Sequence, residues 1–294
     1  MMKNDSPDYL METRLRELNP DLHRRFTDTV VTIQSVLFRF QKLFPDFTDH
    51  SALHSLTVLD FCNYLIGPAQ MMQLNADAIY TLLMSCYLHD VGMGITRKQY
   101  QEYKEEIPFG NYFGKRPDAD EKRVIRDFHQ EFSAAFIRRY AQLLEIPTPE
   151  HEFAIVQVCR GHRRTDLFDV AQFPPHFTVP GGNEIPLPYL AALIRLADEI
   201  DVVAARNPVM LYDVESFSDE LDIAYFRRHE SVKELIIEED AFVLHAVHID
   251  PSVDRMVWDM AVKMQETLEY SREATFQRSP FRISQREVRL VYLD

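Results

Sequence analysis

Residues 76–90 are apolar on most sides, and this stretch constrains the fold more than any other part of the chain. The letters IYTLLMSCYL within it leave no polar face for solvent, so we expect a helix that is buried at the centre of the protein. Glycine is also scarce, at 8 of 294 residues, well below the usual ~7%. So little glycine disfavours a turn-rich all-β fold and favours long helices around the central one.

Helical spacing of apolar residues predicts further helices on both sides of this stretch. Asn19-Pro20-Asp21 separates two of them, because proline is favoured at the first position of a helix. Residues 91–118 are rich in glycine and proline and predict a long excursion with a short helix at 97–106, whereas 163–187 predict a loop or small hairpin. The remaining predicted helices cover residues 7–44 in two pieces, 51–66, 76–90, 119–145, 150–162 and 188–205.

The sequence pattern changes after Asn207-Pro208. Two β-branched runs, VKELIIEED and AFVLHAVHI, flank an acidic turn, a helix is predicted at 252–275, and REVRLVYL predicts a final strand. We therefore expect a mainly α protein with a small C-terminal α+β appendage. Its predicted parts are N-terminal helices over 1–48, a helical domain over 49–206 and an α+β subdomain over 207–294.

The three cysteines, Cys62, Cys86 and Cys159, lie singly in apolar segments. This pattern predicts buried free thiols rather than a disulfide framework, which indicates a reducing, cytoplasmic setting. The first residues lack the apolar core of a signal peptide, so we expect none. We also expect no membrane span, since no stretch reaches the ~18 uncharged apolar residues that one needs.

The chain is acidic, with 32 basic and 46 acidic residues and a net charge of −14. Residues 207–294 carry 10 basic and 18 acidic residues, or −8 of that total. Binding to a phosphate backbone relies on clustered lysine and arginine, so extended nucleic acid is not an expected partner. An anionic ligand would need a local collection of positive charge.

Histidines and aspartates recur at intervals of about one helix plus one connection. The intervals from 54 to 89, 90 to 129, 129 to 162 and 162 to 198 are 35, 39, 33 and 36 residues. A helical bundle can direct such side chains to one interior point, as bundle metal sites do. Carboxylates in apolar surroundings are costly unless they are paired or bound to metal. A helix ion pair with Arg195 is the alternative for Asp198. The series consists of His54, His89-Asp90, His129, His162 and Asp198.

The order H…HD…H…H…D resembles the HD superfamily of metal-dependent phosphohydrolases over roughly residues 50–206. His54 is followed by S-L-x-V, the HD pair by V-G, and Asp198 lies in L-A-D-E-I-D, as in many members. The extra histidines resemble those of the two-metal members. The chain lacks the G-Y-P signature and has Met93 where HD-GYP phosphodiesterases carry lysine, so it is not an HD-GYP enzyme proper. FTDHSALHS and LHDVGM resemble HD proteins of bacterial conflict systems.

The resemblance implies an HD-type helical bundle and a set of metal ligands. His54, His89, Asp90 and Asp198 would complete one site, and His129 and His162 the other, with Asp90 bridging both. Asp90, His129 and His162 are also the catalytic candidates. One or two divalent transition metal ions are implied, and a ligand set without thiolate suits Mn, Fe, Ni, Co or Zn. The implied reaction is hydrolysis of a phosphoester, as a phosphomonoesterase or phosphodiesterase, by a hydroxide that the metal activates.

Basic residues close to these motifs are candidates for substrate binding. Arginine meets phosphate bidentately, although each of these charges taken alone could simply be solvated. His50, four residues before His54, either supports the site or is an ordinary polar residue at a helix start. His151 is expected to be an exposed residue in a first helical turn. The tyrosines of 91–118 stack a base or pack as a lid. The substrate-binding candidates are Arg97, Lys98, Arg163, Arg164 and His50, with Arg160 and Arg195 as further cations near the motifs.

Three functions fit this pattern. The first is a phosphohydrolase that acts on a nucleotide or a related small molecule. The second is a di-iron oxygenase on the HD fold. The third is a non-catalytic sensor or scaffold, whose C-terminal subdomain contacts a protein partner or a second copy. Two carboxylates and two divalent ions leave a local charge of +2 in an acidic chain, which favours a small phosphorylated substrate over a long polyanion.

Overall fold

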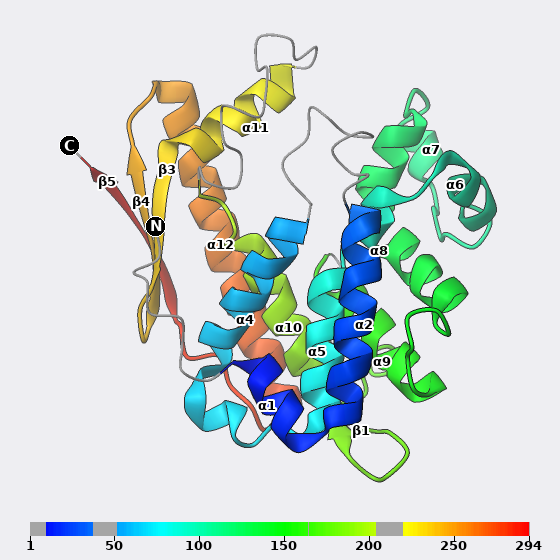
Figure 1. Ribbon diagram of the computed structural model, residues 1–294. Coiled ribbons are helices and arrows are strands. Elements are labelled where there is room, and N and C mark those ends of the chain that lie inside the picture. The colour runs from blue at the N-terminus through cyan, green and yellow to red at the C-terminus, as the bar shows by residue number, and fades with distance from the viewer. Residues whose placement is uncertain (1–9, 38–51, 164, 204–219, 294) are drawn as a thin grey trace.

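Helix α5 (Ala76–Leu88) runs through the centre of the helical bundle (Figure 1). Every residue from Asp77 to Leu88 is buried, and the side-chain oxygen of Asn75 accepts a hydrogen bond from the amide of Ala78 at the helix start. The expected central helix is therefore confirmed. The computed structural model describes residues 10–37, 52–163, 165–203 and 220–293.

The other helices of the bundle surround α5, which packs against α1, α2, α4, α9 and α10. Each of these five buries apolar residues against this common centre, and α8 packs against α9. The mainly helical fold is thus confirmed. These helices are α1 (Met11–Leu18), α2 (Pro20–Leu37), α4 (Ala52–Met71), α8 (Glu121–Tyr140), α9 (Pro149–Gly161) and α10 (Leu187–Glu199).

Glycine and proline shape two of the helix boundaries. α2 begins at Pro20 as predicted, and the side chain of Asn19 accepts a hydrogen bond from the amide of Leu22. The sequence predicted that α4 ends at residue 66, directly before Gly67-Pro68. Instead Gly67, with φ of +67°, kinks α4, which continues to Met71. Only glycine adopts such a left-handed conformation without steric cost.

The excursion after the central helix folds back on the bundle. It consists of a 3₁₀ turn, η1 (Val91–Gly94), and two short helices, α6 (Arg97–Tyr103) and α7 (Tyr112–Lys115). Thr96 and Gln99 form a capping box at the start of α6, so the predicted helix at 97–106 begins where expected and ends three residues earlier. The segment 163–187 contains a two-stranded hairpin, β1 (Phe177–Thr178) and β2 (Glu184–Ile185).

The C-terminal part is a three-stranded sheet with the order β3-β4-β5, seen on the left in Figure 1. β3 and β4 form the predicted antiparallel hairpin, and β5 pairs with β4 in parallel after a helical crossover. That crossover, α12, packs against β5 on one side and against α10 of the bundle on the other. The elements are α11 (Glu220–Ser231), β3 (Val232–Ile237), β4 (Ala241–Val247), α12 (Pro251–Arg278) and β5 (Glu287–Leu293).

The predicted state of the cysteines is confirmed: Cys62, Cys86 and Cys159 are buried free thiols. The Sγ atoms of Cys62 and Cys86 lie 4.0 Å apart between α4 and α5. Among the helices of the described residues, none has the length and apolar character needed to cross a bilayer.

Candidate metal centre

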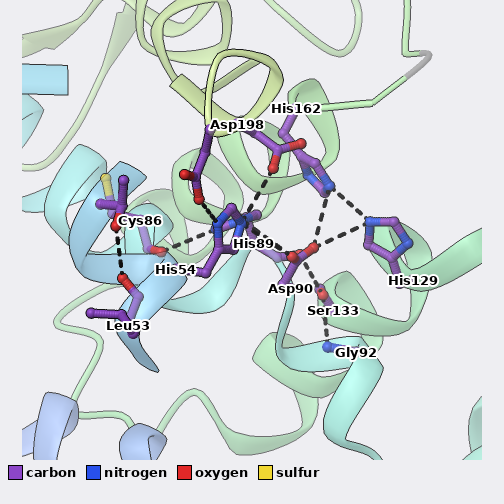
Figure 2. Close-up of polar contacts among 12 residues, drawn as sticks. Leu53, His54, Cys86, His89, Asp90, Gly92, His129, Ser133, His162 and Asp198 are labelled. Atoms are coloured by element: carbon purple, nitrogen blue, oxygen red, sulfur yellow. Dashed lines mark hydrogen bonds and ion pairs between the residues drawn. The ribbon is translucent and has the colours of Figure 1, made fainter. Parts of the chain in front are cut away.

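Five helices of the bundle bring the predicted histidines and aspartates to one buried place (Figure 2). They form two groups that share Asp90, and within each group the potential ligand atoms lie within 4.8 Å of one another. His89 and His162 cap the C-termini of their helices, and His129 follows a kink at Phe128. The first group is His54, His89, Asp90 and Asp198, and the second is Asp90, His129 and His162.

In the first group the Nε2 atoms of two imidazoles face two carboxylates. Nε2 of His54 lies 3.2 Å from Oδ1 of Asp198 and 3.6 Å from Oδ2 of Asp90. Nε2 of His89 lies 3.4 Å from the same Oδ2 of Asp90 and 3.2 Å from Nε2 of His54. The four side chains therefore converge on a single point.

In the second group two imidazoles face the other oxygen of Asp90. Nε2 of His129 lies 3.2 Å and Nε2 of His162 lies 3.6 Å from Oδ1 of Asp90. The two Nε2 atoms are 2.9 Å apart. Asp90 thus turns one oxygen to each group, which is the arrangement that a bridging ligand requires.

The outer nitrogen of each imidazole meets an atom that only accepts hydrogen bonds. Each Nδ1 must therefore donate, and in the neutral ring the Nε2 lone pair then points inward. Inward lone pairs about 3 Å apart repel one another unless a cation or proton lies between them, so these residues fit a divalent metal. The acceptors are Asp201 for His54 (2.7 Å), the carbonyl of Cys86 for His89 (3.0 Å), that of Arg126 for His129 (2.7 Å) and that of Cys159 for His162.

Burial and neighbouring charges set the protonation of this cluster. Burial, together with His89 and His129, holds the pKa of His162 well below its usual value. Burial opposes ionisation of Asp198, but hydrogen bonding and attraction from His54 outweigh it and lower the pKa of Asp198. A neutral imidazole and an ionised carboxylate are the forms that bind metal. Burial also lowers the pKa of His89, yet the charge of Asp90 outweighs this and leaves it raised.

Asp201 is a part of the site that sequence reasoning missed. Its carboxylate is buried and holds His54 from the outer side, 147 residues away along the chain. Carboxylates in this position orient metal-binding histidines and raise their basicity. The available signal was its position three residues after Asp198, in the same apolar segment.

Gly92 allows the turn after Asp90 to lie directly on α8. The amide of Gly92 donates to Oγ of Ser133 over 2.8 Å, and that hydroxyl donates to the carbonyl of His89 over 2.6 Å. A Cβ atom at Gly92 would lie 2.3 Å from the carbonyl oxygen of His129. The glycine after the HD pair therefore brings Asp90 close to His129.

A model of the HD-CE family matches residues 44–272, more than half of the chain. The chain belongs to the HD-CE family. This family has an HD-type domain, so the resemblance seen in the sequence is confirmed at that level. No curated protein and no solved structure matches the chain. The family match includes both groups of the metal centre and extends into α12.

In this HD-CE protein three of the basic residues named from the sequence are described by the structure, and they lie outside the two groups of ligands. Arg97 and Lys98 are on α6 with side chains 86% exposed, and they face Glu121 at 3.6 Å and Glu102 at 3.8 Å respectively. Arg163 directly follows His162 and is half-buried. His50 and Arg164 lie outside the described residues.

Arg160 and Arg195, the two further cations near the motifs, contact groups other than the ligands of the metal centre. Nε of Arg160 lies 3.0 Å from a carboxylate oxygen of Glu131. Arg195 donates to the carbonyls of Gly161 and Thr165. The carboxylate of Asp198 instead faces His54, so the cluster and not a helix ion pair accounts for Asp198.

The expectation that His151 is exposed is wrong. His151 does lie in the first turn of α9, but it is buried, and its Nε2 is 2.8 Å from Oδ1 of Asp77 at the start of α5. Its partner is 74 residues away, so local sequence could not indicate the burial. Tyr100 and Tyr103 of the excursion are also buried and pack within the bundle.

Proposed function

We propose that this HD-CE protein is a metal-dependent phosphohydrolase that cleaves a phosphoester of a nucleotide or a related small molecule. One observation carries the proposal. Four imidazoles donate their Nδ1 protons outward and turn Nε2 toward the carboxylates of Asp90 and Asp198, an arrangement suited to divalent cations. Membership of a family with an HD-type domain supports hydrolysis as the reaction class.

The proposed ligands are the two groups that share Asp90. His54, His89, Asp90 and Asp198 would hold one ion, and Asp90, His129 and His162 a second. Imidazole and carboxylate without thiolate suit Mn, Fe, Ni, Co or Zn. When bound, such ions supply Lewis acidity toward phosphoryl oxygens and acidify coordinated water.

The chain's own residues would orient the substrate and exclude bulk water. The side chain of Asp198 is 19% exposed, whereas that of Asp90 is 2% exposed, so substrate would approach from the side of Asp198. The shared carboxylate of Asp90 would keep the two groups at a fixed separation. His129 and His162 would hold their own ion and face the reacting phosphoryl group. Contacts from Arg97, Lys98, Arg163, Arg164 and His50 to the rest of the substrate remain part of the proposal.

We also propose the class of substrate, the cellular compartment and the partners of the protein. A small phosphorylated substrate suits a buried centre in a chain of net charge −14 better than extended nucleic acid does. We place the protein in the cytoplasm, where three free thiols persist. The C-terminal subdomain would offer a surface to a protein partner or a second copy.

The test combines elemental analysis of the purified protein with a panel of phosphomonoesters, phosphodiesters and nucleotides. We expect bound transition metal, release of phosphate or a nucleotide product, and loss of both metal and activity in His89→Ala and Asp90→Ala. His176→Ala is the matched control, because His176 is 82% exposed and pairs with Glu184 away from the cluster.

Two results would redirect the proposal. Metal-loaded protein that releases nothing from the whole panel would exclude the phosphohydrolase. If the iron-loaded protein then consumed oxygen, the di-iron oxygenase would replace it, and otherwise the sensor or scaffold would. Unchanged activity in both alanine variants would refute the metal centre itself.

A further inference from the structure

Arg195 connects two parts of the metal centre that are far apart in the sequence, the segment around His162 and the helix that carries Asp198. It lies on α10, one turn before Asp198. Its Nε donates to the carbonyl of Gly161 over 2.7 Å, and its Nη2 donates to that of Thr165 over 2.5 Å. These two carbonyls lie on either side of His162 along the chain. One guanidinium therefore links the helix that carries Asp198 to the helix end that carries His162.

Tyr270 of α12 completes this link from the C-terminal part of the chain. The guanidinium carbon of Arg195 lies 4.9 Å from the centre of the Tyr270 ring, within the range of a cation–π contact. The hydroxyl of Tyr270 donates to Asp166 over 2.8 Å and accepts from the amide of Leu167 over 2.7 Å. The same side chain thus holds both Arg195 and the segment that follows His162.

Close packing fixes α9 against α10 at the same level. A Cβ atom at Gly161 would lie 2.5 Å from Cβ of Ala191, so the two helices approach closely next to His162. Ala191 is one turn before Arg195 on α10. The approach sets the distance between the helices, and the two bonds from Arg195 set their positions along one another.

His162 and Asp198 belong to different groups of the metal centre. Their relative position therefore governs whether both groups can be filled at once. We propose that Arg195 and Tyr270 are positioning residues that hold His162 in register with Asp198, so that α12 of the C-terminal subdomain supports binding at the Asp90–His129–His162 group. This inference rests on the metal centre of the proposed function and not on the reaction.

The chemistry of arginine explains why this position is demanding. The planar guanidinium presents several donors in a fixed fork and stacks on an aromatic ring, whereas a lysine ammonium is a compact, strongly hydrated charge. Arg195→Lys keeps the positive charge but cannot reproduce both carbonyl bonds and the ring contact. Tyr270→Phe keeps the ring and removes the hydroxyl with its bonds to Asp166 and Leu167.

The test measures binding of Mn²⁺ alone to the EDTA-treated full chain, by calorimetry and by the electron paramagnetic resonance signal of a coupled manganese pair. We expect two ions in the wild type. In Arg195→Lys the affinity for the more weakly bound ion, which we assign to the Asp90–His129–His162 group, should fall by about 10- to 100-fold, the range found for residues that support metal ligands. The coupled signal should disappear. Tyr270→Phe should show a smaller loss in the same direction.

Arg282→Lys is the matched control. Arg282 also donates to backbone carbonyls, including that of Phe281, and lies over the ring of Phe276, but it contacts no part of the metal centre. The Arg282→Lys variant should bind both manganese ions with the affinity of the wild type. In Arg195→Ala, added guanidinium ion should restore part of the second binding step, which a general loss of stability would not allow.

Wild-type affinity for both ions in Arg195→Lys and Tyr270→Phe overturns the inference, as does equal weakening of both ions. A wild-type chain that binds two ions but cleaves no phosphoester would refute the phosphohydrolase alone. The positioning role would still be supported, because it is read from metal binding.

Discussion

The orientation of each imidazole in the centre is decided by the atom that its outer nitrogen contacts. His89, His129 and His162 each donate Nδ1 to the carbonyl three residues earlier in the chain. His54 instead donates to the carboxylate of Asp201, just after the end of α10. Three of the rings are therefore oriented by their own local backbone, and His54 alone depends on tertiary structure for this contact.

Asp201→Asn should weaken metal binding while the fold is kept. The amide cannot stabilise positive charge on His54 as the carboxylate does, and it can rotate to present its NH₂ group to Nδ1. We expect affinity for Mn²⁺ to fall by about 10- to 100-fold, measured by competition with a chelating dye. Asp254→Asn is the control, because Asp254 lies 2.7 Å from His248 in a pair outside the cluster. Equal affinities in the wild type and Asp201→Asn would contradict the orienting role.

The difference between local and distant contacts explains which site residues sequence could predict. His54, His89 and Asp90 stand in apolar helical segments, where a polar residue needs a reason to be buried. Asp201 stands in such a segment too, but its role depends on His54, 147 residues away. The exposure of His151 was predicted wrongly for the same reason, since Asp77 meets it only after α5 and α9 have packed.

At the scale of elements, the buried carboxylate of Asp77 connects α5 to α9 and to the segment before β2. Oδ1 of Asp77 on α5 lies 2.8 Å from Nε2 of His151 on α9, and Oδ2 accepts from Asn183, before β2, over 2.6 Å. Burial disfavours the ionised form of Asp77. The bonds from His151 and Asn183 outweigh burial and hold the pKa of Asp77 below the ordinary value of 3.8.

The stabilisation that ionised Asp77 contributes to the folded protein should therefore depend on pH. Because the folded pKa is lower than the unfolded one, this stabilisation is fully present above about pH 4 and is lost as pH falls through the folded pKa. Asp77→Asn should reduce the free energy of unfolding above that pH, and the difference from wild type should shrink below it. Urea unfolding of EDTA-treated protein from pH 3 to 6 measures this.

Glu184→Gln provides the control for Asp77, because Glu184 pairs with the exposed His176. Its unfolding free energy should follow that of the wild type across the series. A difference between wild type and Asp77→Asn that stayed constant with pH would show that Asp77 does not ionise in the folded protein as described.

Element positions were predictable where the sequence marks them locally. Asn75 and Pro20 mark helix starts, and the structure places helices at both. At Gly67 the same local reasoning predicted a helix end, whereas the helix resumes after the kink. A left-handed residue interrupts the hydrogen-bond ladder, but whether the chain turns away or continues depends on what it packs against.

At the scale of the whole molecule, the structure changes the charge expected at the centre. Sequence reasoning counted two carboxylates against two divalent ions and predicted +2. Asp201 adds a third carboxylate, so two ions would leave +1. Within a chain of net charge −14, the centre would still attract a small anion. Because the positive charge at the centre is smaller than the sequence predicted, phosphate contacts from other cations become more important to substrate binding.

Metal should stabilise the whole bundle, because the two groups of ligands come from five separate helices that only folding brings together. An ion that binds the native state alone stabilises it by about 2.7 kcal/mol when its free concentration is 100 times Kd. Excess Mn²⁺ should therefore raise the Tm of EDTA-treated protein, measured by scanning calorimetry. Asp90→Asn should lose most of the rise, because Asp90 is shared by both groups, whereas His176→Ala should keep it. Equal Tm values with EDTA and with excess Mn²⁺ would mean that the inward Nε2 atoms face protons rather than metal.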